Sequence, residues 1–219
     1  MTSSELKVTA DHILEICKRL HSRNMLAAAD GNISVRLNNN QIMITPSGIA
    51  KAFMSADAMA IMDLDGNSIQ GQPSSEKLMH LEVFKNCPKA VCVVHAHPVT
   101  ATAWSIAQPD LKQLPAEALS EVILATGGIP IAPYARPGTV DMGSVLKEYL
   151  PHHRALILSR HGALTWGESI EEAYRGMERI EHSAQVLMAA HLMGGVTKLS
   201  PEEIQHLHEM RKKIGEVLL

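Results

Sequence analysis

Short apolar segments of strand length, set between longer helical segments, constrain the fold of this chain more than any other feature. Residues 90–95, 129–132 and 155–159 are mostly apolar, and each segment is too short to form a stable helix. Residues 33–37 and 41–45 alternate in strand fashion around Asn38-Asn39-Asn40 and predict a hairpin. These segments lack the regular period of a doubly wound fold. The sequence therefore predicts an α/β fold whose sheet is largely antiparallel and flanked by helices.

Helical periodicity and capping residues predict the remaining elements. Thr9 is the expected N-cap of a first helix, Ser74 or Ser75 that of a second, and Ser200 that of the last. The other expected helices cover residues 98–107, 116–126, 143–149 and 170–193. A chain of 219 residues is long enough to bury a sizeable core, and we expect a single domain over residues 1–219.

Composition excludes several classes of function. A formal net charge of −3 and only two Trp, three Tyr and two Phe argue against a nucleic-acid-binding surface. No apolar run reaches the length of a membrane helix, and the first residues do not resemble a signal peptide. Three cysteines without a CxxC motif are expected to be reduced thiols. We therefore expect a cytoplasmic protein that binds neither membrane nor nucleic acid.

Histidines at two strand ends are the main candidates for chemistry. His95-Ala96-His97 ends an apolar strand, and in an extended chain residues i and i+2 share a face. His161 follows a second apolar strand. Three imidazoles form one of the recurring catalytic zinc sets. The alternative is that the histidines are satisfied by ordinary hydrogen bonds at the strand ends.

Glu76 is the candidate carboxylate beside these histidines. It is expected in the first turn of a helix, where it would act as a metal ligand, as a base or as an ordinary stabiliser of the helix dipole. A carboxylate beside a Lewis-acid metal suits proton abstraction next to a polarised carbonyl. His80 lies one turn later and is either a partner of this site or a packed histidine.

Three short segments are candidates for anion binding, namely Gly31-Asn32, Ser47-Gly48 and Ser74-Ser75. Glycine lets the backbone approach an anion closely, hydroxyls donate hydrogen bonds, and a helix N-terminus presents N–H groups to a phosphate. Taken alone, each segment is more often explained by a turn or a helix cap. Lys51 follows the second segment and could assist a phosphate, although we expect it to be solvated.

In their order along the chain, these residues resemble the class II aldolase/adducin family, and most of all its L-fuculose-phosphate aldolases. The matching segments are Ala29–Ser34, Thr45–Gly48, Pro73–Glu76 with Met79-His80, His95–Pro98, Ala132–Tyr134 with Gly138-Thr139, and His161-Gly162. The resemblance covers nearly the whole chain.

The resemblance implies one Zn²⁺ per subunit, held by His95, His97 and His161 with Glu76 as a fourth ligand. It implies that Glu76 leaves the metal to act as the acid/base. It further implies a substrate phosphate bound by Gly31, Asn32, Ser47, Gly48, Ser74 and Ser75. The implied reaction, part of carbohydrate metabolism, is cleavage of a ketose 1-phosphate to dihydroxyacetone phosphate and an aldehyde. The implied assembly is a homotetramer with active sites at its interfaces.

The chain departs from the fuculose-phosphate aldolases on the aldehyde side of the site. Rough alignment puts Glu121 where they carry a tyrosine, residues 200–219 contain no tyrosine, and Pro137 replaces a phenylalanine. Glu117 lies near the glutamate used by the family's methylthioribulose-phosphate dehydratases, or else is a solvated carboxylate. A dehydratase, a keto-sugar-acid phosphate decarboxylase and a non-catalytic adducin-like interaction domain therefore stay as alternatives to the aldolase.

Overall fold

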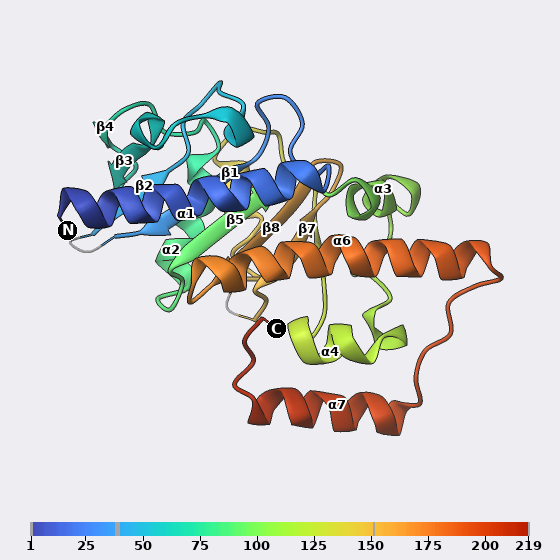
Figure 1. Cartoon of the computed structure of the whole chain (residues 1–219). Helices are drawn as coiled ribbons and strands as arrows, with labels where there is room; N and C mark the ends of the chain where they lie inside the picture. Colours follow the sequence, from blue (N-terminus) through green and yellow to red (C-terminus); the bar gives the residue numbers. More distant parts are fainter. Residues whose placement is uncertain (1, 38–39, 151, 219) are drawn as a thin grey trace.

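An eight-stranded sheet forms the centre of the molecule in the computed structural model, which describes residues 2–37, 40–150 and 152–218 (Figure 1). The strands are β1 (Asn32–Arg36), β2 (Gln41–Ile44), β3 (Ala60–Asp63), β4 (Ser68–Gln70), β5 (Cys92–Ala96), β6 (Ile131–Ala132), β7 (Ala155–Leu158) and β8 (Gly162–Gly167). Their spatial order is β4-β3-β2-β1-β5-β8-β7-β6. Every pairing is antiparallel except that of β6 with β7. The predicted fold class is thus confirmed.

Helices cover both faces of this sheet. They are α1 (Ser3–Ser22), α2 (Lys77–Asn86), α3 (Val99–Ala107), α4 (Ser120–Thr126), α5 (Asp141–Ser144), α6 (Ile170–Leu192) and α7 (Pro201–Lys213), with 3-10 turns η1 (Lys51–Phe53), η2 (Ala56–Ala58) and η3 (Ala116–Ala118). In Figure 1, α1 and α6 cross the near face of the central strands, and α7 lies beside α4 at the edge of the molecule. No helix among the described residues is long and apolar enough to cross a membrane.

Alternating side chains of the strands build two separate cores. Along β5, Cys92, Val94 and Ala96 are buried in the core beneath α1 and α6. Val93 is buried in the second core, beneath α2 and α5. Because the side-chain period of a strand is two, His95 lies on the same face of β5 as Val93. The alternation of side chains along β5 therefore directs His95 toward helix α2.

The first helix begins earlier than its expected cap. A capping box at Thr2 starts α1, in which the Thr2 side chain accepts from the Glu5 N–H and the Glu5 carboxylate accepts from the Thr2 N–H. This reciprocal pair satisfies two otherwise free donors, so the expectation of a cap at Thr9 was wrong. Ser200 does cap α7, accepting from the Glu203 N–H at 3.2 Å.

Other boundaries also differ from expectation. Neither Ser74 nor Ser75 is the N-cap of α2, because Glu76 itself occupies that position without a side-chain cap. The expected helix over 116–126 is divided into η3 and α4, and that over 143–149 is only the short α5. Strands β4 and β8 were not expected. The expected hairpin is confirmed as β1 and β2, but two of its three turn residues, Asn38 and Asn39, lie outside the described residues.

Candidate metal centre

Three imidazoles meet where the central strands end. His95 is the penultimate residue of β5, His97 follows the strand, and His161 lies in the turn between β7 and β8. Because β8 pairs with both β5 and β7, these strand ends are adjacent. One ring nitrogen from each histidine lies within 4.8 Å of those of the other two. The fold thus brings together the three histidines that the sequence singled out.

Two glycines allow this close approach. A Cβ atom on Gly162 would lie 2.5 Å from the Ala96 carbonyl oxygen and 2.8 Å from Cδ2 of His97. Gly31 has φ +69°, and a Cβ atom there would lie 2.9 Å from the carbonyl oxygen of His95. Any larger residue at either position would force the histidine-bearing backbone apart.

Hydrogen bonds to the outer ring nitrogens indicate the tautomers of two histidines. Nδ1 of His95 donates to the Ala163 carbonyl at 2.8 Å, and Nδ1 of His97 lies 3.3 Å from Oδ2 of Asp30. The two Nε2 atoms, left with lone pairs, face each other at 3.1 Å. Facing lone pairs repel each other unless a cation lies between them. This arrangement therefore fits a metal ion, and Zn²⁺ is commonly bound by such imidazoles.

Glu76 adds a carboxylate to the same cluster. Its Oε2 lies 3.4 Å from Nε2 of His95, and its Oε1 lies 3.2 Å from Nε2 of His161. Burial raises the pKa of Glu76, but the hydrogen bond with His161, the charges of His95 and His161 and the Asn32 amide together hold it well below its usual value. The carboxylate therefore stays ionised beside the three imidazoles.

A buried chain of hydrogen bonds fixes the position of the Glu76 side chain. The side-chain amide Nδ2 of Asn32 donates to Oε2 of Glu76 at 2.8 Å, and the side-chain oxygen Oδ1 of Asn32 accepts from Nε2 of His80. Nδ1 of His80 then accepts from the Ser34 hydroxyl at 2.6 Å. Burial lowers the pKa of His80 to about 4, so the ring is neutral near pH 7. His80 is thus both buried and a partner of the site.

A cavity of about 430 Å³ opens beside the cluster and falls within the usual range of ligand pockets. Its lining includes His97, His161 and Glu76, whereas the fully buried His95 lies behind them. All six predicted phosphate-binding residues also line it, namely Gly31, Asn32, Ser47, Gly48, Ser74 and Ser75. Three segments that are distant in the sequence therefore face one cavity.

Lys51 is a cavity residue whose environment the sequence did not indicate. It is 3% exposed, and its Nζ donates to the carbonyl oxygens of Ala29 and Ile49, each at 2.7 Å. Burial lowers the pKa of Lys51, while Cys17, Asp30 and Glu76 oppose that shift. The expectation of a solvated lysine was wrong. A buried ammonium group facing the cavity is a charge that could bind a phosphate.

The other singled-out residues lie in different surroundings. Glu117 is not among the residues that line this cavity, and its carboxylate forms an ion pair with Nζ of Lys198 at 2.5 Å. Glu121 is exposed in the first turn of α4. Pro137 does line the cavity. Within the chain, the proposed metal and phosphate residues are therefore gathered together, and Glu117 is separate from them.

Comparison with known proteins agrees with this geometry. The family model for the class II aldolase and adducin N-terminal domain matches residues 11–188. The chain belongs to the class II aldolase/adducin family. One relative in this family, an L-fuculose phosphate aldolase from Methanococcus maripaludis, is 34% identical over 79% of this chain and 92% of its own length. Another, a 3-oxo-tetronate 4-phosphate decarboxylase from Escherichia coli, is 29% identical over 81% of this chain and 84% of its own.

Solved structures in the family have the same fold. YgbL from Escherichia coli, described as a putative aldolase/epimerase/decarboxylase, superposes with a TM-score of 0.85 at 26% identity, covering 93% of this chain and 99% of its own. An L-fuculose 1-phosphate aldolase superposes with a TM-score of 0.83 at 26% identity, covering 97% and 98%. The two solved structures therefore resemble this chain to a similar extent.

Proposed function

We propose that this chain is a zinc-dependent lyase that cleaves a small ketose 1-phosphate to dihydroxyacetone phosphate and an aldehyde. The observation that carries the proposal is the shared cavity, in which Glu76 and the histidine cluster face six candidate phosphate-binding residues. Membership of the family and relatives described as L-fuculose phosphate aldolases support the same reaction class. The homotetramer with interface sites stays a prediction from the resemblance.

In this proposal the substrate phosphate occupies the end of the cavity formed by Ser47-Gly48 and Ser74-Ser75. Hydroxyl groups and backbone N–H groups there donate to its oxygens, and the Lys51 ammonium group supplies a positive charge. Fixing the phosphate places the carbonyl end of a small sugar near Glu76 and the histidines. His95, His97 and His161 would hold the ion, which when bound supplies Lewis-acid polarisation of the ketose carbonyl.

Glu76 is proposed to carry the proton. Cleavage breaks the carbon–carbon bond beyond the carbonyl, and the hydroxyl group on the far carbon gives its proton to the ionised Glu76 carboxylate as it becomes the aldehyde. The electron pair of the broken bond stays on the phosphate-bearing fragment, and Glu76 returns the proton to the carbon of that fragment. Glu76 is the carboxylate within the cavity that contacts two of the histidines, and its side chain is 15% exposed. The Asn32–His80–Ser34 chain orients it.

Decarboxylation of a keto-acid phosphate is the second candidate. Relatives described as 3-oxo-tetronate 4-phosphate decarboxylases, and the replacement of the aldehyde-side aromatic residues, favour it. Loss of CO₂ leaves an electron pair on a carbon beside the carbonyl, and that carbon takes a proton that solvent supplies through Glu76. The dehydratase would require Glu117, which is ion-paired with Lys198 outside the cavity.

Product analysis tests the proposal. Zinc-reconstituted protein is incubated with a panel of ketose 1-phosphates and keto-acid phosphates, and the products are identified by mass spectrometry. The aldolase releases dihydroxyacetone phosphate and an equal amount of aldehyde. Release of CO₂ without dihydroxyacetone phosphate would instead establish the decarboxylase, and a product that keeps every carbon would establish the dehydratase. An absence of turnover on every substrate would favour the adducin-like interaction domain.

A further inference from the structure

A second cavity lies at the opposite end of the central strands. Its volume is about 680 Å³, larger than that of the cavity beside the histidine cluster, and no residue lines both. Its walls include the residues that precede β5 and β7, the end of β8, and helix α7. Four cationic side chains and three histidines line it, namely Lys89, Arg154, Arg211, Lys212, His152, His153 and His208. The one acidic lining residue is Glu216.

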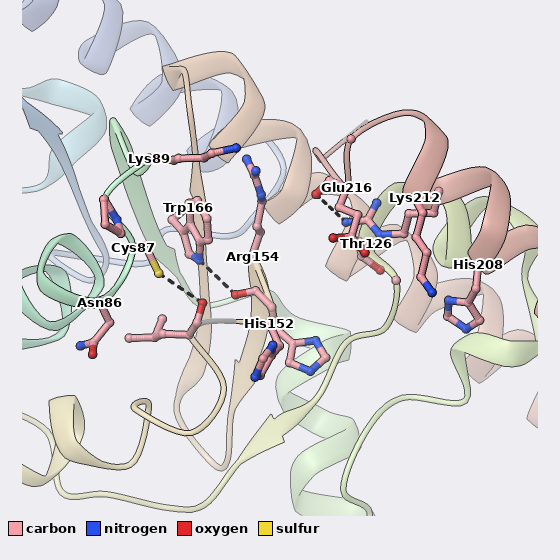
Figure 2. A pocket seen from close by; sticks show the side chains of 16 residues that line it. Asn86, Cys87, Lys89, Thr126, His152, Arg154, Trp166, His208, Lys212 and Glu216 are labelled. Atoms are coloured by element: carbon pink, nitrogen blue, oxygen red, sulfur yellow. Dashed lines mark hydrogen bonds between the residues drawn. The ribbon is translucent and has the colours of Figure 1, made fainter.

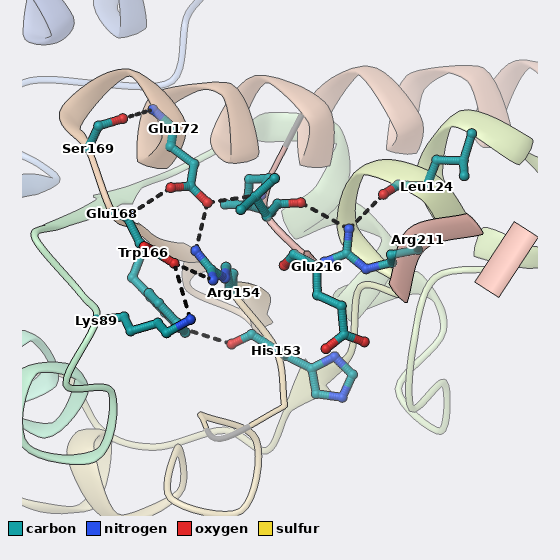
Figure 3. A network of polar contacts seen from close by, with 12 residues as sticks. Lys89, Leu124, His153, Arg154, Trp166, Glu168, Ser169, Glu172, Arg211 and Glu216 are labelled. Atoms are coloured by element: carbon teal, nitrogen blue, oxygen red, sulfur yellow. Dashed lines mark hydrogen bonds and ion pairs between the residues drawn. The ribbon is translucent and has the colours of Figure 1, made fainter. Parts of the chain in front are cut away.

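Arg154 lines this cavity, and several contacts hold its side chain in place. Its guanidinium group stacks on the Trp166 ring at 4.5 Å from the centroid. Nη1 donates to Glu172 and Nη2 to Glu168, each at 2.8 Å (Figure 3). The two carboxylates therefore compensate the charge of Arg154, and Oε1 of Glu168 also lies 4.0 Å from Nζ of Lys89. The uncompensated positive charge in the cavity is that of Arg211 and Lys212.

Arg211 is bonded differently. It is 6% exposed, and its guanidinium group donates to the carbonyl oxygens of Leu124 at 2.6 Å, Glu216 at 2.8 Å and Val217 at 3.0 Å. No carboxylate from the described part of the chain forms an ion pair with it. Carbonyl oxygens satisfy the N–H groups but leave the net charge in place. The cavity wall therefore holds a buried cation with a fixed orientation.

His153 lines the cavity and carries a buried ring nitrogen that has no hydrogen-bond partner among the residues that the structure describes. Within the described ranges, its Nδ1 is the one buried side-chain nitrogen or oxygen without a hydrogen-bond partner. Buried polar atoms are nearly always paired, so such an atom beside a cavity indicates a missing polar group. Lys89 approaches from the β5 side, while His208 and Lys212 approach from α7 (Figure 2).

We propose that this cavity binds a small multivalent anion carrying phosphoryl or carboxylate groups. Lys89 and Lys212 bind it from the two sides, the Arg211 charge attracts it, and the His153 ring supplies the remaining hydrogen bond. Such an anion connects α7 to the sheet and so fixes the C-terminal helix against the body of the protein. The site is separate from the proposed catalytic cavity, and its occupancy does not depend on the reaction catalysed there.

Tryptophan fluorescence offers a local readout, because Trp166 lines this cavity while Trp104, the other tryptophan in the sequence, packs between α3 and α6. In a Trp104→Phe background, the full-length protein is titrated with pyrophosphate, inorganic phosphate and citrate at constant ionic strength. The phosphate and citrate arms distinguish phosphoryl from carboxylate recognition. The six proposed phosphate-binding residues beside the histidine cluster do not line this cavity, so phosphate bound there would not contact Trp166.

The variants test the site directly. Lys89 and Lys212 are both exposed, so the double variant Lys89→Ala/Lys212→Ala is expected to fold normally. We expect it to raise the Kd for pyrophosphate by at least about tenfold. The matched control Lys213→Ala removes an exposed charge from the same helix outside the cavity lining, and should change Kd by less than about twofold. Equal Kd values in the double variant and the control would overturn the proposal, as would no saturable signal with any of the three anions up to about 10 mM.

Discussion

Strands β5, β8 and β7 carry polar clusters at both ends, and the two clusters differ in which partner they lack. At the end that carries His95, ring nitrogens with lone pairs face one another at 3.1 Å beside a carboxylate. At the other end, the Arg211 guanidinium and the unpaired Nδ1 of His153 border a cavity rich in cations. The first arrangement attracts a cation and the second an anion. One sheet can therefore position opposite kinds of site at the two ends of its central strands.

The largest effect is expected from Glu76→Gln. The substitution keeps the shape of the side chain but removes the proton carrier, so kcat should fall at least about a hundredfold, the scale of a positioned acid/base. The protein should keep its metal, measured by elemental analysis alongside steady-state rates. Glu82→Gln is the matched control, since Glu82 lies in α2, the helix that Glu76 precedes, and has the same 15% side-chain exposure. Unchanged kcat in Glu76→Gln would remove this residue from the mechanism.

At the opposite end, Glu172→Gln should affect stability and not metal binding. Glu172 is 5% exposed and binds Arg154, so the substitution leaves a buried guanidinium less compensated. Urea denaturation should show a loss of about 3 kcal/mol in the free energy of unfolding. Glu168→Gln, whose side chain is 42% exposed, should cost less than about 1 kcal/mol. Similar losses of unfolding free energy in the two variants would show that burial does not make the Arg154–Glu172 ion pair stronger than the Arg154–Glu168 pair.

His80 should make the metal end sensitive to acid. The pKa of His80 is about 4 in the folded protein and about 6.5 in the unfolded chain. As the pH falls between these values, the ring is protonated in the unfolded chain but stays neutral in the folded protein, so the folded protein is destabilised. The contribution of the neutral His80 ring to the free energy of unfolding is complete above about pH 6.5 and is lost toward pH 4. Between about pH 7.5 and 5, zinc-free wild type should lose about 2 kcal/mol more than His80→Gln. An equal loss in both proteins, measured by urea denaturation, would contradict the buried neutral ring.

A smaller effect is expected from Asp30→Asn. The Asp30 carboxylate lies 3.3 Å from Nδ1 of His97 and orients that ring, but its side chain is 49% exposed. Removing such an outer partner should weaken zinc binding by about tenfold, measured by competition with a chelator. Asp57→Asn, an exposed acidic residue that does not line the histidine-cluster cavity, should leave zinc affinity unchanged. Equal affinities in the two variants would show that the contact is incidental.

Local patterns predicted the fold class and much of the metal end, because they report directly on strand ends. The His-x-His pair, the segment before β1 and the Ser74–Glu76 run each mark a place where an element starts or stops. Strand β8 was missed, although it brings His161 to His95, because Gly162 and Gly167 bound a segment with weak periodicity. The burial of Lys51 depends on the packing of distant elements, which a local pattern does not report.

The cavity at the opposite end of the central strands could not be predicted from local sequence patterns. Arg154 precedes β7, Trp166 lies in β8 and Arg211 lies in α7, and only the folded chain brings these residues together. Each residue alone looks like an ordinary charge or a core aromatic. No short spacing relates β7, β8 and α7, so the cavity between them had no signature in the sequence. Sites built by register and long-range packing are therefore the ones that require a structure.

Metal content tests the central claim most directly. After reconstitution with zinc and removal of free metal, elemental analysis of the wild-type protein should give about one equivalent per chain. His161→Ala should lose most of that zinc, whereas His153→Ala, at the opposite end of the same strands, should keep it. Less than about one tenth of an equivalent in the wild type, or equal zinc in His161→Ala and wild type, would contradict the proposed metal centre.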